Sequence, residues 1–226
     1  MASACAASGD YGQAYTWFTD CLTLYQQLGD QVGQAIVQQN LSLVTEHQGH
    51  HRIALGHAEQ ALHLFQAIGH RAGQGPALNS VGWCHALLGD YEQARAFCRR
   101  AVAVNSELGN RNNEAAAWDS LGYAEHRLGN LTEAATCYRQ ALGLAREAGD
   151  RFGEAEVLTH LGDNCLASGE RRGAGHAWHK ALDVLDDLHH AGAAPLRAKL
   201  QQLGQHFATR PRRPHDGLAG PRAGSR

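Results

Sequence analysis

A glycine recurs every 20 residues through most of the chain, and this spacing constrains the fold more than any other feature. The series runs from Gly9 to Gly169, and Asp or Asn follows most of its members. Glycine readily takes the left-handed conformation that ends a helix, and Asp or Asn caps the helix that follows. Between these marks apolar residues recur at spacings of three and four, as in Tyr91, Ala94 and Cys98. The sequence therefore predicts helices joined by tight turns.

Two consecutive helices make a unit of 40 residues that repeats in line. The predicted fold class is all-α: a right-handed α-solenoid with about 4.5 such repeats and a C-terminal capping helix. We expect this domain to span residues 1–207 and residues 208–226, rich in Arg, Pro and Gly, to form a disordered basic tail. The expected helices cover residues 10–28, 32–48, 50–68, 72–88, 90–108, 112–128, 130–148, 152–168, 170–188 and 194–207.

Residues 1–8 are too few for a full helix, so the helix expected at 10–28 lacks the usual first partner of its pair. Two explanations stay open for this end. Either a short turn caps the array, or the chain corresponds to the tail of a longer ancestral regulator. A solenoid needs a polar cap at each end, and Tyr15 and Trp17 would otherwise be unprotected.

Several positions agree in register across the units and resemble the tetratricopeptide repeat (TPR). The stretch from Trp118 to Gly122 has the W-x2-L-G order of that family, and Gly82 and Gly162 follow aliphatic versions of it. Second helices supply the family's Ala-x3-aromatic pattern, as at Ala134 and Tyr138. The resemblance covers roughly residues 1–190. It departs from the family in its longer period, and in the poor match of the unit at 32–70.

The junction phrase Gly-Asp-Arg-x-Gly-Glu-Ala, complete at residues 149–155, is similar to the C-terminal repeat arrays of large bacterial transcriptional regulators, including the SARP activators with NB-ARC-type domains. It also resembles the 40-residue repeats of animal spindle-orientation scaffolds. The resemblance implies a protein-binding or peptide-binding module. No Gly-rich phosphate loop and no nucleophile elbow occur in the sequence, so the nucleotide-binding and DNA-binding parts of those regulators are missing from this chain.

Composition restricts the remaining function classes. The net charge of −2 argues against general nucleic-acid binding by the folded part, and no apolar run is long enough to span a membrane. With no secretory signal at the N-terminus, we expect a cytoplasmic protein. The cysteines at positions 5, 21, 84, 98, 137 and 165 are too widely spaced for metal pairs and are expected to be buried thiols. No cofactor, metal site or catalytic residue is predicted, although His47, His50 and His51 lie close together.

In TPR-like arrays the first helix of each pair lines the concave face, and the resemblance places the binding site there. The predicted groove residues are those around the Leu-Gly mark: Gln39, Asn40, Leu43, Asn79, Ser80, Trp83, Asp119, Ser120, Tyr123, His126, Thr159, His160 and Asp163. Trp83 and Tyr123 are candidate anchors, or else pack between repeats. Leu43 and Asp163 would make the wall apolar at one end and acidic at the other, which suits a peptide with an apolar residue followed by a basic one.

Three functions compete. The first is a protein-binding or peptide-binding module, with a regulatory or scaffolding role, that binds a partner through the groove. The second is a small-ligand or signal-peptide sensor that uses the same groove and needs a deeper, more closed pocket. The third is an enzyme, for which the sequence offers no catalytic constellation. The sequence names neither the partner nor the oligomeric state.

Overall fold

The computed structural model describes residues 10–208, and within this range it contains ten helices and no strand. The predicted all-α solenoid is confirmed, and each predicted helix appears with its ends shifted by no more than a few residues. The helices are α2 (Tyr11–Leu28), α3 (Gln31–His47), α4 (His51–Ala67), α5 (Arg71–Leu88), α6 (Tyr91–Glu107), α7 (Arg111–Arg127), α8 (Leu131–Ala148), α9 (Arg151–Ala167), α10 (Arg171–Asp187) and α11 (Ala193–Ala208).

The glycine marks end the helices as the spacing predicts. The eight glycines of the series from Gly29 to Gly169 have positive φ angles between 65° and 88°. After α5 the N–H of Gly89 donates to the Ala86 carbonyl and the N–H of Asp90 to the His85 carbonyl, which is the Schellman arrangement. His70 stands where most of these turns have Asp or Asn, and it also caps its helix, because its Nδ1 accepts the Gly73 N–H at 3.0 Å.

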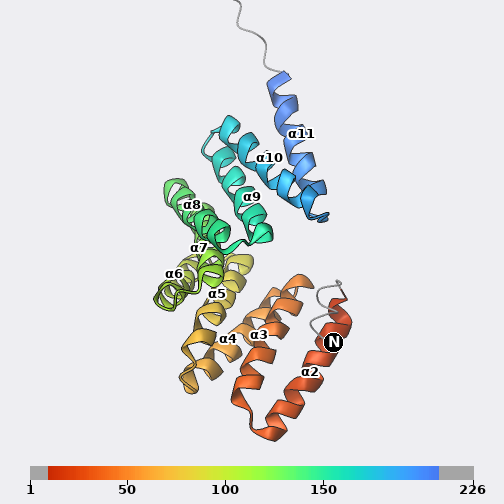
Figure 1. The fold of residues 1–226 in the computed structure, drawn as a ribbon, viewed down its shortest axis with the longest axis vertical. Helices are drawn as coiled ribbons and strands as arrows, with labels where there is room; N and C mark the ends of the chain where they lie inside the picture. Colours follow the sequence, from red (N-terminus) through yellow and green to blue (C-terminus); the bar gives the residue numbers. More distant parts are fainter. Residues whose placement is uncertain (1–9, 209–226) are drawn as a thin grey trace, which may run out of the picture.

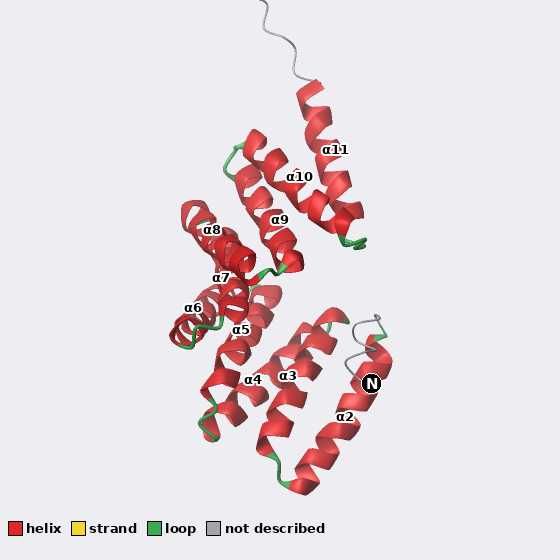
Figure 2. Ribbon diagram, in the orientation of Figure 1, coloured by secondary structure: helices red, strands yellow, loops and turns green. Residues whose placement is uncertain are grey.

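Consecutive helices pack antiparallel, and the array curves so that α3 and α9 face one another across its inner side (Figures 1 and 2). The first helices of the four complete pairs, α3, α5, α7 and α9, contact one another in succession and form that inner layer. The second helices α4, α6, α8 and α10 lie outside them. Four complete pairs and the single helix α2 give the predicted 4.5 repeats.

In three of the four pairs, α5 with α6, α7 with α8 and α9 with α10, a glycine on the first helix meets a larger side chain on the second. A Cβ atom at Gly82 would lie 2.5 Å from the Cys98 sulfur, and one at Gly122 would lie 2.7 Å from the Tyr138 ring. At Gly162 the Trp178 ring would be only 2.3 Å away. These contacts are too short for any side chain on the first helix, so glycine is required there for the backbones to approach this closely.

In three of the four pairs an arginine ties the start of the first helix to the end of the second. Arg71 bonds Glu107, Arg111 lies 4.0 Å from Glu147, and Arg151 bonds Asp187 at 3.0 Å. The two partners are always 36 residues apart and belong to one helix pair. These ion pairs are solvent-exposed, so each adds little stability. Their recurrence explains why the phrase repeats in the sequence.

The helix α11 covers the last pair as expected. Leu196 is 2% exposed and packs with Trp178, while Leu200 and Leu203 are half-buried in the same cluster. The predicted tail begins at the edge of the described residues, and positions 209–226 lie outside them. No helix among residues 10–208 is long and apolar enough to cross a bilayer.

The thiols follow the prediction only in part. Cys84, Cys98 and Cys137 are buried, and burial raises the pKa of Cys98 to about 12. Cys21 and Cys165 are only half-buried. The five cysteines of the described range are all free, and Cys5 lies outside it.

Candidate functional site

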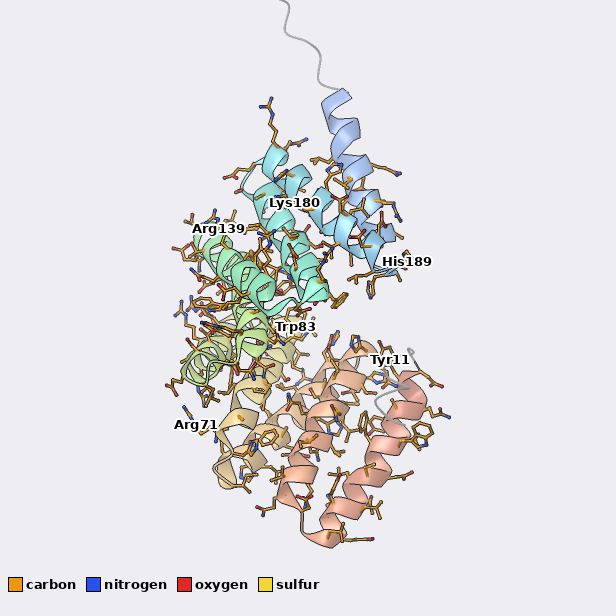
Figure 3. The ribbon with its side chains drawn as sticks, in the orientation of Figure 1. Tyr11, Arg71, Trp83, Arg139, Lys180 and His189 are labelled. Atoms are coloured by element: carbon orange, nitrogen blue, oxygen red, sulfur yellow. The ribbon has the colours of Figure 1, made fainter. Side chains whose placement is uncertain are left out.

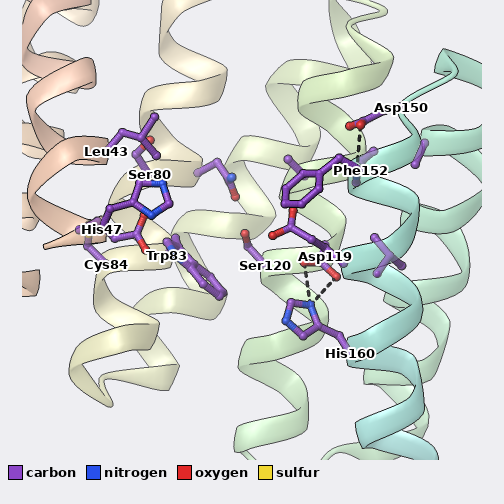
Figure 4. A pocket seen from close by; sticks show the side chains of 18 of the residues that line it. Leu43, His47, Ser80, Trp83, Cys84, Asp119, Ser120, Asp150, Phe152 and His160 are labelled. Carbon is purple, nitrogen blue, oxygen red and sulfur yellow. Dashed lines mark hydrogen bonds and ion pairs between the residues drawn. The ribbon is translucent and has the colours of Figure 1, made fainter. Parts of the chain in front are cut away.

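A groove of about 430 Å³ runs along the inner face of the array and is lined by side chains from all four first helices (Figure 4). Its lining residues are Ser42, Leu43, Glu46, His47, Asn79, Ser80, Trp83, Cys84, Ala115, Ala116, Asp119, Ser120, Ala145, Asp150, Phe152, Gly153, Glu156, Val157 and His160.

The groove crosses the repeats diagonally. It uses residues 42–47 of α3, residues 79–84 of α5, residues 115–120 of α7 and residues 150–160 around the start of α9. When the four stretches are aligned by the 40-residue repeat, each one begins roughly one helical turn, ~3.6 residues, before the equivalent position of the preceding first helix. The groove therefore begins near the end of α3 and finishes near the start of α9.

The α3 and α5 wall is mostly neutral, and Leu43 and Trp83 are its large apolar side chains. The side chain of Leu43 is 51% exposed and offers an apolar surface to the groove. Cys84 is buried beneath it, and its thiol lies 3.9 Å from the Ser42 hydroxyl. The only ionisable side chains that this wall adds, beyond the Cys84 thiol, are Glu46 and His47.

Trp83 lies at the middle of the groove and rests on Tyr123. The two ring centroids are 5.2 Å apart in an edge-to-face arrangement, and both rings are half-buried against Ala86 and Ala124. Only Trp83 lines the groove, because Tyr123 stands behind it and accepts a hydrogen bond from Arg127 at 3.0 Å. Trp83 is thus held in a fixed position with part of its surface open, while Tyr123 acts as its support.

The α7 and α9 wall carries most of the charge. His160 Nδ1 lies 2.9 Å from the Asp119 carboxylate, so these two helices are joined across the wall. Asp150 caps α9 by accepting the Gly153 N–H at 2.9 Å. Phe152, 40% exposed, and Glu156 complete this wall (Figure 4).

Two groups of this wall have shifted pKa values. Burial alone would lower the pKa of His160, but the charge and hydrogen bond of Asp119 outweigh it and the net shift is upward. Although Glu156 keeps contact with solvent, partial desolvation in the groove raises its pKa to about 7, and the negative charge of Asp119 adds to the shift. A carboxyl group held against its own ionisation marks a position that a cation would stabilise.

Seven of the thirteen predicted residues line the groove: Leu43, Asn79, Ser80, Trp83, Asp119, Ser120 and His160. Their part in binding stays a prediction. The other six do not line it. Gln39 and Asn40 lie one turn before the stretch that α3 contributes, and Tyr123 stands behind Trp83.

Three further predicted positions are already occupied by contacts within the protein. His126 bonds Asn164 at 2.9 Å, and the Thr159 hydroxyl donates to the carbonyl of Ala155 at 2.8 Å. Asp163 accepts from Lys199 at 2.6 Å and from the Trp178 indole at 3.1 Å. The expected acidic end of the groove at Asp163 is therefore wrong, because that carboxylate holds the capping helix.

Sequence reasoning missed the residues at the two ends of the groove: Glu46, His47, Asp150, Phe152 and Glu156. It applied the same positions to every repeat, whereas the groove drifts by about one turn per repeat. A helical shift of three or four residues from Leu43 would have found Glu46 and His47, and one from His160 would have found Glu156. No single repeat contains that signal.

A second pocket, of about 410 Å³, lies on the opposite side of α7, between α6 and α8. Its floor includes Trp118 and the nearly buried carboxylate of Glu125, which Arg99 reaches at 2.9 Å and Asn130 at 2.8 Å. Glu125 stands where the TPR pattern has a tyrosine, and these partners explain how a charge is accepted there. Among the described residues no cluster of His, Cys, Asp or Glu is arranged to hold a metal ion.

The family model described as tetratricopeptide repeat matches residues 1–67, 73–147 and 113–185. No match was found among curated proteins. Among solved structures, BtubC from P. vanneervenii is similar over 99% of this chain and 85% of its own, with a TM-score of 0.66 and 16% identity.

Two Rap structures are also similar. A Rap protein complexed with Competence and Sporulation Factor has a TM-score of 0.61 and 19% identity, covering 88% of this chain and 60% of its own. The apo form of RapI has a TM-score of 0.69 and 14% identity, covering 92% of this chain and 57% of its own. This chain thus spans about three fifths of the length of the Rap proteins. At these identities the likeness shows the fold.

Proposed function

The chain belongs to the tetratricopeptide repeat family, and we propose that it is a regulatory or scaffold module that binds an extended peptide segment of a protein partner in its inner groove. The observation that carries this proposal is the continuity of the groove across α3, α5, α7 and α9. A strip that crosses four helices suits an extended chain better than a compact ligand.

The side chains on the surface of the groove also favour the binding of a peptide. Leu43, Trp83 and Phe152 offer partly exposed apolar contacts, and Trp83 is a rigid aromatic group of the kind that anchors partners. Between them the half-buried Asn79 and Ser80 offer an amide group and a hydroxyl oxygen to a peptide backbone. One of the structurally similar proteins, a Rap protein, was crystallised with Competence and Sporulation Factor, which agrees with a binding role.

We further propose that the partner belongs to a regulatory pathway like those of the bacterial transcriptional regulators whose repeat arrays carry the same junction phrase. In this proposal the array contributes recognition, and the activity it controls belongs to the partner.

Blocking the groove tests the proposal. Ala116 is exposed at the middle of the groove on α7, so Ala116→Trp should fill it without disturbing the core. The matched control is Ala96→Trp, at an exposed position on the outer helix α6. Each full-length variant is used to capture partners from an extract of the source cells, and the bound proteins are quantified by mass spectrometry.

We expect one or more proteins to be retained by the wild-type chain and by Ala96→Trp and lost with Ala116→Trp. The opposite pattern would place the interface on the outer face. Failure of the wild-type chain to retain any protein above an unrelated helical control would contradict a protein-binding role.

A further inference from the structure

Negative charge predominates in the groove, whose only basic groups within residues 10–208 are the imidazoles of His47 and His160. Its lining contains the carboxylates of Glu46, Asp119, Asp150 and Glu156, and no lysine or arginine stands among the described residues that form it. These carboxylates come from three different first helices or the turn before one of them. The array therefore gathers four carboxylates along one groove.

Two of the four carboxylates have partners and two do not. Asp119 is matched by His160, and Asp150 is used in capping α9. Within residues 10–208, neither Glu46 nor Glu156 makes an ion pair. Burial is the main cause that raises the pKa of Glu156. The charges of Asp119, Asp150 and Glu46 add to this shift and that of His160 opposes it, so the carboxylates of α3, α7 and α9 act on one another across the groove.

The aromatic side chains of the groove add to the same preference. Trp83 and Phe152 line it from opposite walls (Figure 4), and the face of an aromatic ring attracts a cation. Beside them Leu43 leaves an exposed apolar surface at the α3 end. Carboxylates with aromatic faces suit an ammonium or guanidinium group, and the apolar surface suits a neighbouring hydrophobic side chain.

We infer that the groove selects a cationic peptide segment, with a lysine or arginine side chain held between Glu46 and Glu156 and an apolar side chain placed against Leu43. This inference rests on the proposed function and specifies the chemistry of the partner. Charge complementarity carries it, because a basic segment supplies a counter-charge for Glu46 and Glu156, which make no ion pair among the described residues.

Selection from a random peptide display library on the full chain tests the inference without knowledge of the natural partner. We expect the enriched peptides to carry lysine or arginine beside an apolar residue. The most enriched peptide is then titrated calorimetrically into the wild-type chain, Glu46→Gln and Glu156→Gln. Each variant should lose about fivefold or more in affinity, and added salt should weaken wild-type binding.

Glu133→Gln is the matched control, since Glu133 is exposed on α8 in the lining of the pocket on the other side of the array. Its affinity should equal that of the wild-type chain. Enriched peptides that are neutral or acidic, or affinities unchanged in both groove variants, would overturn the cationic preference while leaving peptide binding intact. Free arginine amide binding as tightly as the peptide would also overturn it, because the groove would then recognise a small cation.

Failure of the proposed function looks different. In that case no peptide is enriched on the wild-type chain relative to Ala116→Trp, whatever its charge.

Discussion

The two halves of the array are built from the same kind of repeat but differ in two places. One is the seam, the position where the first helix of a pair packs most closely on the second, and the other is the wall that each half gives to the groove. In the first complete pair the equivalent seam positions are Ser42 and Ala58, two small residues. In the last two pairs the seam has a glycine facing a large ring, as at Gly122 and Tyr138, and in the α5 and α6 pair Gly82 faces Cys98. The same position of the repeat is therefore filled by two small residues in one pair and by a glycine and a ring in another.

The walls differ in chemistry. The α3 and α5 wall offers Leu43 and Trp83 with one carboxylate, whereas the α7 and α9 wall holds three of the four groove carboxylates. The positions of a first helix that face the groove differ from those that pack against its second helix. A single repeat architecture can therefore carry a mostly neutral and an acidic wall side by side, and the proposed binding preference rests on the difference between them.

The largest expected effect is on the glycine seam. Gly122→Leu forces a side chain into the space of the buried Tyr138 ring, and overpacking of this kind costs about 1–3 kcal/mol or more. Thermal unfolding should show a clearly lower Tm for Gly122→Leu. An unchanged Tm would mean that α7 and α8 do not approach as closely as the structure has them.

Exchanging one seam type for the other sharpens the comparison. Gly122→Ser and Tyr138→Ala together reproduce the Ser42 and Ala58 combination of the first pair. Each single change should destabilise the chain, and the double variant should be more stable than their sum predicts by about 0.5–3 kcal/mol, as for directly coupled residues. Urea unfolding of the four proteins measures this coupling, and additive effects would contradict it.

Truncating Trp83 tests the α3 and α5 wall of the groove as a binding surface. Trp83→Ala should weaken partner or peptide binding by about 2 kcal/mol, as for a central anchor. Tyr123→Ala should cost less, because Tyr123 only supports the Trp83 ring. The control is Arg139→Ala on the outer surface of α8 (Figure 3). Arg99, which is also on the outer face, does not serve as a control, because Arg99→Ala would remove an ion-pair partner of the buried Glu125. Equal losses for Trp83→Ala and Arg139→Ala would contradict an anchor in the groove.

The acidic wall should show a smaller effect, on stability. Glu156 titrates near pH 7 in the folded chain but near its ordinary value of 4.5 when unfolded. Between these values the folded state binds more protons than the unfolded state, so this group lowers the stability as pH rises.

Glu156→Gln removes that effect. The variant should be more stable than the wild-type chain at about pH 8, and the two should converge at about pH 4. Urea unfolding at both values measures the difference. A variant that is less stable at the higher value would mean that Glu156 serves the fold and not the groove.

The fold could be predicted from the sequence because the information is local. A positive φ at Gly89 or a cap at Asp150 depends on residues within one or two turns, and the spacing repeats this information along the chain. The middle of the groove, with Trp83 and Asp119, was found for the same reason. Its ends were not, because the diagonal course that brings Glu46 and Phe152 into the lining accumulates over several repeats. Likewise, nothing near Asp163 reveals that Lys199 occupies it.

The central claim is that the inner face of the first helices is the binding surface, and site-specific photo-crosslinking tests it most directly. Benzoylphenylalanine replaces Ala116 in the groove in one variant and Ala96 on the outer face in another. Each is irradiated with the captured partner or the selected peptide. We predict a crosslinked product from the Ala116 position and none from the Ala96 position. A product from Ala96 alone would contradict the claim.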